Sequence, residues 1–261
     1  MNDLFQCSTC SKESYDMIPI SRVVGKLDEF FSKNDLDGAG RLLEYWEREA
    51  RNLCDVRGLL EILNEEIGYF RRVGNKEKGL SAVHAAFEIV EKNGWTDSVS
   101  TGTLYLNGAT TIKSFGDTSN AMPYYDKARS IYTKTLDPDD YKMAAYYNNV
   151  SSAYTDLGDF ESAINSCMCA IDILKKHEGC GGEIAVSLVN IAHIYYSIDP
   201  CDERIYDTME QAWEHLNSVE NKHDGNFAFL CSKCYPSFAF FGYFEYEKTL
   251  KELVDRIYEG N

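Results

Sequence analysis

The stretch "AAYYNNVSSAYTDLGDFESAINSCMCAIDIL", residues 144–174, has the pattern of two amphipathic helices joined by a tight turn at Gly158. Glycine adopts the left-handed conformation that often ends a helix without steric cost. Asp159, which follows directly, can cap the next helix by accepting a hydrogen bond from its free backbone N–H groups. The stretch therefore predicts an antiparallel pair of helices.

The same pattern recurs along the chain with a period of 42 residues. Gly74, Gly116, Gly158 and Gly242 lie at multiples of this period, and Pro200 takes the one remaining position. A second series with the same spacing consists of Ala86, Ala128, Ala170 and Ala212. Two independent series with one period indicate an internal repeat. The small alanines predict close helix crossings, where a larger side chain would overpack the contact.

This pattern resembles that of tetratricopeptide repeat (TPR) proteins. Within residues 144–174 the family pattern is matched at Tyr147, Val150, Ser151, Tyr154, Gly158, Ala163, Cys167 and Ala170. The common repeat has about 34 residues, and eight more add about two helical turns, as in the longer repeats of kinesin light chains and bacterial peptide-sensing regulators. The resemblance implies an all-α fold, a right-handed superhelical solenoid of about six antiparallel helix pairs.

Extending the register outward predicts the boundaries of the six pairs. They are residues 20–53, 55–93, 98–136, 139–177, 181–218 and 224–259, with 20–261 forming one solenoid and 1–19 an irregular N-terminal segment. The outer pairs are less regular. The first has "KNDLDGAG" in place of a turn glycine, and the fifth has "IDPCDE". The sixth carries Pro236 inside its first helix, where we expect proline to start or kink the helix.

The composition limits the classes of partner. The chain has a net charge of −16, so it lacks the basic face that nucleic acids and anionic membranes require. No stretch approaches the ~18 consecutive apolar residues of a membrane span, and the start does not have the pattern of a signal peptide. Nine cysteines, scattered without a dense framework, fit reduced thiols. We therefore expect a cytoplasmic protein that binds neither nucleic acid nor membrane.

The resemblance implies a concave groove, lined by the first helix of each pair, that receives a segment of another protein. Asn107 and Asn149 lie nine residues before their turn glycines, and Asn190 takes the equivalent place in the fifth pair. In similar proteins such asparagines hold the backbone of a bound peptide. The alternative is that groove positions are merely polar. The predicted peptide-binding set is Asn64, Arg71, Arg72, Asn107, Thr110, Lys113, Asn148, Asn149, Ser152, Asn190, His193 and Tyr196.

Three cations in that set bear on the chemistry of the partner. Arg71, Arg72 and Lys113 end the first helices of the second and third pairs. They favour a protein or peptide partner with an acidic side chain, a C-terminal carboxylate or a phosphate, because arginine matches such anions in a bidentate way. The alternative is that they only complement the negative ends of their helices.

Two C-x-x-C pairs have a spacing that many zinc sites use. Cys231 and Cys234 occupy an apolar helical stretch at core positions, which predicts burial as small hydrophobic residues. Cys7 and Cys10 lie five repeats away, so we expect no site shared by both pairs, no bound metal and no cofactor. By themselves, Cys7 and Cys10 could still bind a metal with a partner or react as thiols.

Catalysis has little support, because the five histidines fall at unrelated points of the repeat and no catalytic motif is present. The sequence predicts a non-enzymatic scaffold or adaptor. Two alternatives remain: a peptide-sensing regulator that acts through a partner protein, and a metal- or redox-responsive protein that uses Cys7 and Cys10.

The sixth pair is rich in aromatic residues. Its aromatic side chains are Phe227, Phe229, Tyr235, Phe238, Phe240, Phe241, Tyr243, Phe244 and Tyr246. They predict either a homodimer surface or close packing against the fifth pair around Trp213.

Overall fold

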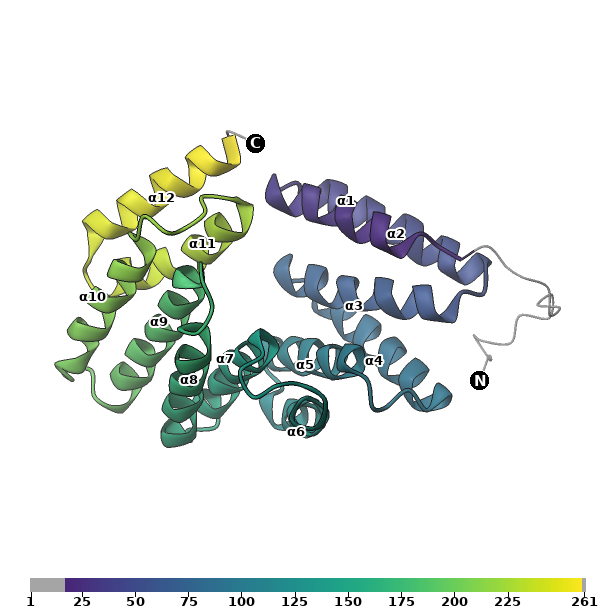
Figure 1. Ribbon diagram of the computed structural model, residues 1–261, viewed down its shortest axis with the longest axis horizontal. Coiled ribbons are helices and arrows are strands. Elements are labelled where there is room, and N and C mark those ends of the chain that lie inside the picture. Colours follow the sequence, from purple (N-terminus) through teal and green to yellow (C-terminus); the bar gives the residue numbers. More distant parts are fainter. Residues whose placement is uncertain (1–16, 260–261) are drawn as a thin grey trace. The chain divides into compact units, whose positions relative to one another are not determined.

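The computed structural model describes residues 17–259, and within this range it contains twelve α-helices and no β-strand (Figure 1). The helices are α1 (Ile20–Ser32), α2 (Leu36–Asn52), α3 (Val56–Arg72), α4 (Lys76–Asn93), α5 (Val99–Ser114), α6 (Thr118–Thr135), α7 (Tyr141–Asp156), α8 (Phe160–Leu174), α9 (Gly181–Ile198), α10 (Arg204–Leu216), α11 (Gly225–Phe240) and α12 (Phe244–Glu259). The prediction of an all-α, TPR-like fold built from helix pairs is confirmed. No helix in residues 17–259 is long and apolar enough to cross a lipid bilayer.

The helices group into two compact units. The first ends at Asp97 and contains α1 to α4, and the second begins at Ser98 and contains α5 to α12. In the second unit the helices of each pair pack most extensively on one another, and the first helices of successive pairs also contact: α5 with α7, α7 with α9, and α9 with α11. This arrangement places α7, α9 and α11 next to one another (Figure 1). A single solenoid over 20–261 stays a prediction.

The turns within the pairs have the predicted backbone. Gly74, Gly116, Gly158 and Gly242 have φ angles of +73°, +90°, +77° and +88°, all in the left-handed region. In the first pair Asn34 takes this place with φ +54°. Asparagine suits the role because its short polar side chain tolerates left-handed backbone better than most residues do. The helices therefore end where the repeat period predicts.

The caps after these turns follow the prediction in two of three cases. Asn75 and Asp159 each accept a hydrogen bond from the backbone N–H three residues later, at 3.1 Å in both cases. Asp117 differs, because its side chain makes no capping bond and instead accepts from Asn120 Nδ2 at 2.9 Å. A neighbouring side-chain amide thus replaces the backbone donor at this one turn.

The alanine series lies in the core. Ala86, Ala128, Ala170 and Ala212 are all 0% exposed, as close helix crossings require. At the C-terminal pair, α11 begins at Gly225, well before Pro236, and continues to Phe240. Of the two alternatives, Pro236 does not start this helix, and a kink at Pro236 stays a prediction. Packing of α11 on α9 and α12 outweighs the intrinsic cost of proline in a helix.

Candidate functional site

A pocket of about 350 Å³ lies between α7, α9 and α11 of the second unit. Its polar lining consists of Tyr141, Asn148, Asn149, Ser152, Glu183, Asn190 and Lys233. Four of these residues, Asn148, Asn149, Ser152 and Asn190, belong to the predicted groove set. The structure therefore brings one part of that set together around a single cavity.

The α7 wall follows from helical spacing. Asn148, Asn149 and Ser152 lie within four residues of one another, so they share one face of the helix. Asn149 Nδ2 donates to the carbonyl oxygen of Ala145 at 2.8 Å, and Ser152 Oγ donates to the carbonyl oxygen of Asn149 at 2.8 Å. These local bonds orient both side chains, and Asn149 retains its carbonyl oxygen and one N–H for a ligand.

Asn148 connects the two neighbouring first helices. Its Oδ1 accepts from Ser187 Oγ on α9 at 2.8 Å, and Ser187 is fully buried. A buried hydroxyl must find a partner, so this bond holds α7 and α9 in a defined register. Asn148 therefore lines the pocket and also connects the two helices that form it.

Among the polar residues that line the pocket, Asn190 has the side-chain amide best able to hydrogen-bond a ligand. It is half-buried on α9, and its side chain makes no hydrogen bond with any residue in the range 17–259. A half-buried amide with two donors and one acceptor unused suits a peptide group, which presents one acceptor and one donor.

Two charged side chains of opposite sign also line the pocket. Glu183 Oε1 accepts from Tyr141 Oη at 3.0 Å. Burial, followed by the nearby Glu183 carboxylate, raises the pKa of Tyr141, so the phenol stays a hydrogen-bond donor. On α11, Lys233 Nζ lies 4.4 Å from the ring centroid of Phe229. Because Glu183 and Lys233 carry opposite charges, the pocket can accommodate a peptide segment that is zwitterionic or mildly acidic.

The residues predicted on α5 do not line this pocket. Thr110 Oγ1 donates to the carbonyl oxygen of Leu106 at 2.8 Å and accepts from Tyr125 Oη at 3.2 Å. Asn107 is half-buried on the same helix. The Thr110 hydroxyl is therefore engaged within the α5–α6 pair.

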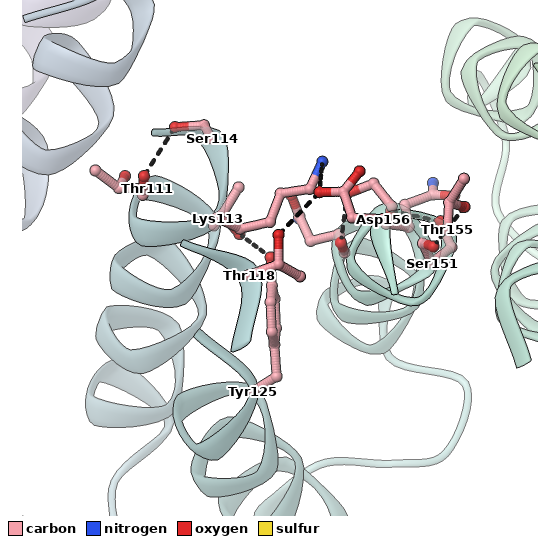
Figure 2. Close-up of polar contacts among 12 residues, drawn as sticks. Thr111, Lys113, Ser114, Thr118, Tyr125, Ser151, Thr155 and Asp156 are labelled. Carbon is pink, nitrogen blue, oxygen red and sulfur yellow. Dashed lines mark hydrogen bonds and ion pairs between the residues drawn. The ribbon is translucent and has the colours of Figure 1, made fainter. Parts of the chain in front are cut away.

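Lys113 forms an ion pair with the next pair of helices. Its Nζ lies 3.3 Å from Asp156 Oδ2 at the end of α7, and Thr118 Oγ1 donates to the same oxygen at 3.0 Å. Figure 2 shows the carboxylate of Asp156 meeting both Lys113 and Thr118. The cation thus has an anionic partner already, which weakens its predicted role in attracting an anionic feature.

His193 and Tyr196 face the aromatic end of α11. His193 Nε2 lies 2.8 Å from Ser237 Oγ, and its ring centroid is 4.9 Å from that of Phe241. Tyr196 packs on Phe240 with centroids 5.0 Å apart. Burial lowers the pKa of His193, so the ring is neutral near pH 7. Both residues join α9 to α11 beside the pocket and do not line it.

The other three predicted residues lie on α3 in the first unit. Asn64 Nδ2 contacts Glu65 Oε1 at 3.5 Å. Arg72 Nη2 donates to Asn34 Oδ1 at 3.0 Å, and its guanidinium carbon lies 5.2 Å from the centroid of Phe31. Arg72 therefore ties α3 to the turn after α1, and Arg71 is half-buried beside it.

The cysteines follow the sequence interpretation where they are described. Cys231 and Cys234 are both 0% exposed, so their burial is confirmed. Burial raises the pKa of Cys231 to about 12, which makes this thiol unreactive. Cys7 and Cys10 lie outside the described residues. Between 17 and 259, no three or more histidine, cysteine, aspartate or glutamate side chains gather in a way that could hold a metal ion.

Sequence reasoning missed Tyr141, Glu183 and Lys233 as lining residues. Tyr141 and Glu183 lie 42 residues apart and hydrogen-bond to each other, so the repeat period could have revealed this pair. Lys233 had no comparable signal, because its place depends on how α11 packs on α9.

The aromatic side chains of the sixth pair are mostly packed. Tyr246 stacks on Trp213 with centroids 4.1 Å apart, and Phe238 is 0% exposed. Phe240 and Phe244 are 56% and 65% exposed. Packing against the fifth pair therefore accounts for much of the aromatic content, and self-association through the two exposed rings stays a prediction.

Comparison with known proteins agrees with this architecture. Residues 100–176 match the family model described as tetratricopeptide repeat. The structure is similar to BtubC (BKLC) from P. vanneervenii, with a TM-score of 0.62 and 20% identity over 75% of this chain and 79% of that chain. For the apo form of RapI the TM-score is 0.60 at 15% identity, over 92% of this chain and 66% of that chain.

A third solved structure is also similar. A kinesin light chain-like protein of Podosopora anserina with nearly identical TPR-like repeats has a TM-score of 0.53 at 15% identity, over 76% of this chain and 94% of that chain. At such identities the solved structures show a shared fold. Residues 100–176 therefore match the tetratricopeptide repeat family, and the chain shares the fold of these solved TPR-like proteins.

Proposed function

We propose that this protein is a non-enzymatic scaffold that holds a segment of another protein in the pocket between α7, α9 and α11. One observation carries the proposal: Asn148, Asn149, Ser152 and Asn190, from two helices, line one pocket of about 350 Å³. The TPR fold supports a protein-interaction role in general.

The chemistry of the pocket favours an extended peptide over a compact metabolite. A peptide that enters a groove must have its backbone N–H and C=O groups satisfied, since each buried group left unpaired costs roughly 1–3 kcal/mol. The unused amide of Asn190 and the remaining capacity of Asn149 can satisfy such groups from two neighbouring helices. Lys233 on the third helix favours a segment with an acidic side chain or a C-terminal carboxylate.

Selection from a random 12-residue peptide library tests this proposal. Peptides that bind the wild-type protein should lose roughly 5- to 150-fold in affinity for Asn190→Ala, the equivalent of 1–3 kcal/mol for an unpaired buried group. Asn165→Ala is the matched control, because Asn165 is exposed on α8 and does not line the pocket. It should leave affinity unchanged.

The melting temperature separates binding from folding. The Asn190 side chain makes no hydrogen bond within 17–259, so its truncation should change the melting temperature little. If the selected peptides bound Asn190→Ala as tightly as wild type, this pocket would not be the site. A regulator that passes a peptide signal to a partner protein is the alternative, and it would use the same pocket.

A further inference from the structure

We propose that a second pocket, between α2, α3 and α4 of the first unit, binds the ammonium or guanidinium group of a ligand through the carboxylate of Glu66. This pocket has a volume of about 420 Å³ and is separate from the peptide pocket of the second unit. The proposal rests on the burial, the missing partner and the charged surroundings of Glu66.

Glu66 is a buried carboxyl group that opens into the pocket. Its residue is only 4% exposed, and it lines the cavity from α3. Its carboxyl group forms no hydrogen bond or ion pair with any residue from 17 to 259. Because an ionised carboxylate is costly to bury without a partner, this group needs either a proton or a cation.

Two of the three basic side chains in the walls, Arg51 and Lys78, already have acidic partners. Arg51 Nη2 lies 2.7 Å from Glu47 Oε1 on α2, and Lys78 Nζ of α4 lies 3.4 Å from Glu44 Oε1. Outside these two ion pairs the lining has two acidic side chains, Asp37 and Glu66, and one basic side chain, Arg41, so the pocket keeps a net negative charge when Glu66 is ionised. The arrangement therefore favours a cationic ligand over an anionic one.

Aromatic rings add to the preference for a cation. Tyr69 and Phe70 of α3 both line the pocket, and ring faces attract ammonium and guanidinium groups. Lys78 Nζ already lies 5.5 Å from the centroid of the Phe70 ring, so Tyr69 is the ring that can serve a ligand. Gly40 on α2 lets the Tyr69 hydroxyl approach closely, because a Cβ atom at residue 40 would overlap it. The wall that Tyr69 forms thus depends on glycine at this position.

The protonation state of Glu66 couples ligand binding to pH. Burial, followed by the neighbouring Glu47, raises the pKa of Glu66 to about 8, although Arg51 and Lys78 act in the opposite direction. Glu44 on α2 raises this pKa further. The other titratable groups that line the pocket are Asp37, Arg41 and Tyr69. An arriving cation must displace the proton, so affinity should increase as the pH rises through about 8.

Methylguanidinium chloride is the probe, because it stays charged from pH 6.5 to 9. We expect saturable binding to the wild-type protein. The measurement is the change in NMR chemical shifts of residues in the first unit. Affinity should be at least ~10-fold higher at pH 9 than at pH 6.5, because only the ionised fraction of Glu66 binds. Methylurea, the neutral isostere, should not bind.

Two matched variants locate the site. Glu66→Gln should abolish both the binding and its pH dependence. Glu61→Gln, an exposed position on the same helix outside the pocket lining, should change neither. Absence of wild-type binding at pH 9, or equal affinity in Glu66→Gln, would overturn the proposal. If Glu66→Gln failed to fold, a wild-type affinity that stayed flat from pH 6.5 to 9 would overturn it equally.

A blocked Gly-Arg-Gly tripeptide identifies the source of the cation. If it binds as well as methylguanidinium does and its binding is lost in Glu66→Gln, the site takes the arginine or lysine side chain of a protein. If only the free methylguanidinium binds, the site takes a small free cation. Either result supports the proposal, and neither depends on the peptide pocket of the second unit.

Discussion

At the scale of the residue, Glu66 is unusual because it is a carboxyl group on the buried face of α3, where its neighbours are apolar. Its neighbours on the same helix, Leu63 and Ile67, are buried at 2% and 0% exposure. A carboxyl group at such a position is tolerated while it carries a proton, and it becomes costly when it ionises. Glu66 therefore links the stability of the first unit to pH.

The free energy of unfolding should fall as the pH rises from about 4.5 to about 8. The folded-state pKa of Glu66 is raised from 4.5 to about 8, so its contribution is fully present below the unfolded value and is lost as pH rises through the folded value. A shift of this size corresponds to roughly 5 kcal/mol.

Urea denaturation of the wild-type protein and Glu66→Gln at pH 5 and pH 8.5 measures this effect. The variant should lose less stability than the wild type between the two pH values and should be the more stable protein at pH 8.5. Identical pH profiles for the two proteins would show that Glu66 ionises freely in the folded state.

At the scale of the element, the alanine series sets how closely the two helices of a pair approach. Ala128 on α6 and Ala170 on α8 are 0% exposed, and they belong to the most extensively packed pairs, α5 with α6 and α7 with α8. A leucine at either position has no space without moving a helix.

Ala128→Leu and Ala170→Leu should each destabilise the protein by about 1–3 kcal/mol, the usual cost of overpacking a close contact. Glu161→Gln, at an exposed position in the first turn of α8, should change stability by less than about 0.5 kcal/mol. Urea denaturation at a single pH provides the comparison. Equal midpoints for all three variants would contradict the close helix crossings.

At the scale of the whole molecule, the chain divides into two units. The first ends at Asp97, and the second begins at Ser98. In repeat proteins each helix pair contacts only its neighbours, so stability is close to a sum of repeat and interface terms. A fragment that keeps several intact pairs can therefore keep its fold.

A fragment of residues 98–261 should fold without the first unit. Its helix content by circular dichroism should equal that of α5 to α12. It should also bind the peptides selected for the pocket that Asn190 lines. The fragment 98–216 is the control. It lacks α11 and therefore one wall of the pocket, so it should not bind these peptides. An unfolded 98–261 fragment would show that the first unit is required for folding.

The local pattern was sufficient to predict the helix pairs. Turn glycines such as Gly158 and alanines such as Ala170 act through backbone conformation and side-chain size, which are properties of the residue itself. The grouping of Asn148, Asn149 and Ser152 was predictable for the same reason, since helical spacing alone places them on one face.

Contacts between distant segments decided the rest. Lys113 seemed available to a partner until Asp156, 43 residues later in the chain, proved to pair with it. The sequence pattern did not single out Glu66, and only the packing of α2 and α4 around α3 buries it. Burial and pairing depend on which helices meet, so the repeat determined the scaffold, whereas the tertiary structure decided which polar groups are left for a ligand.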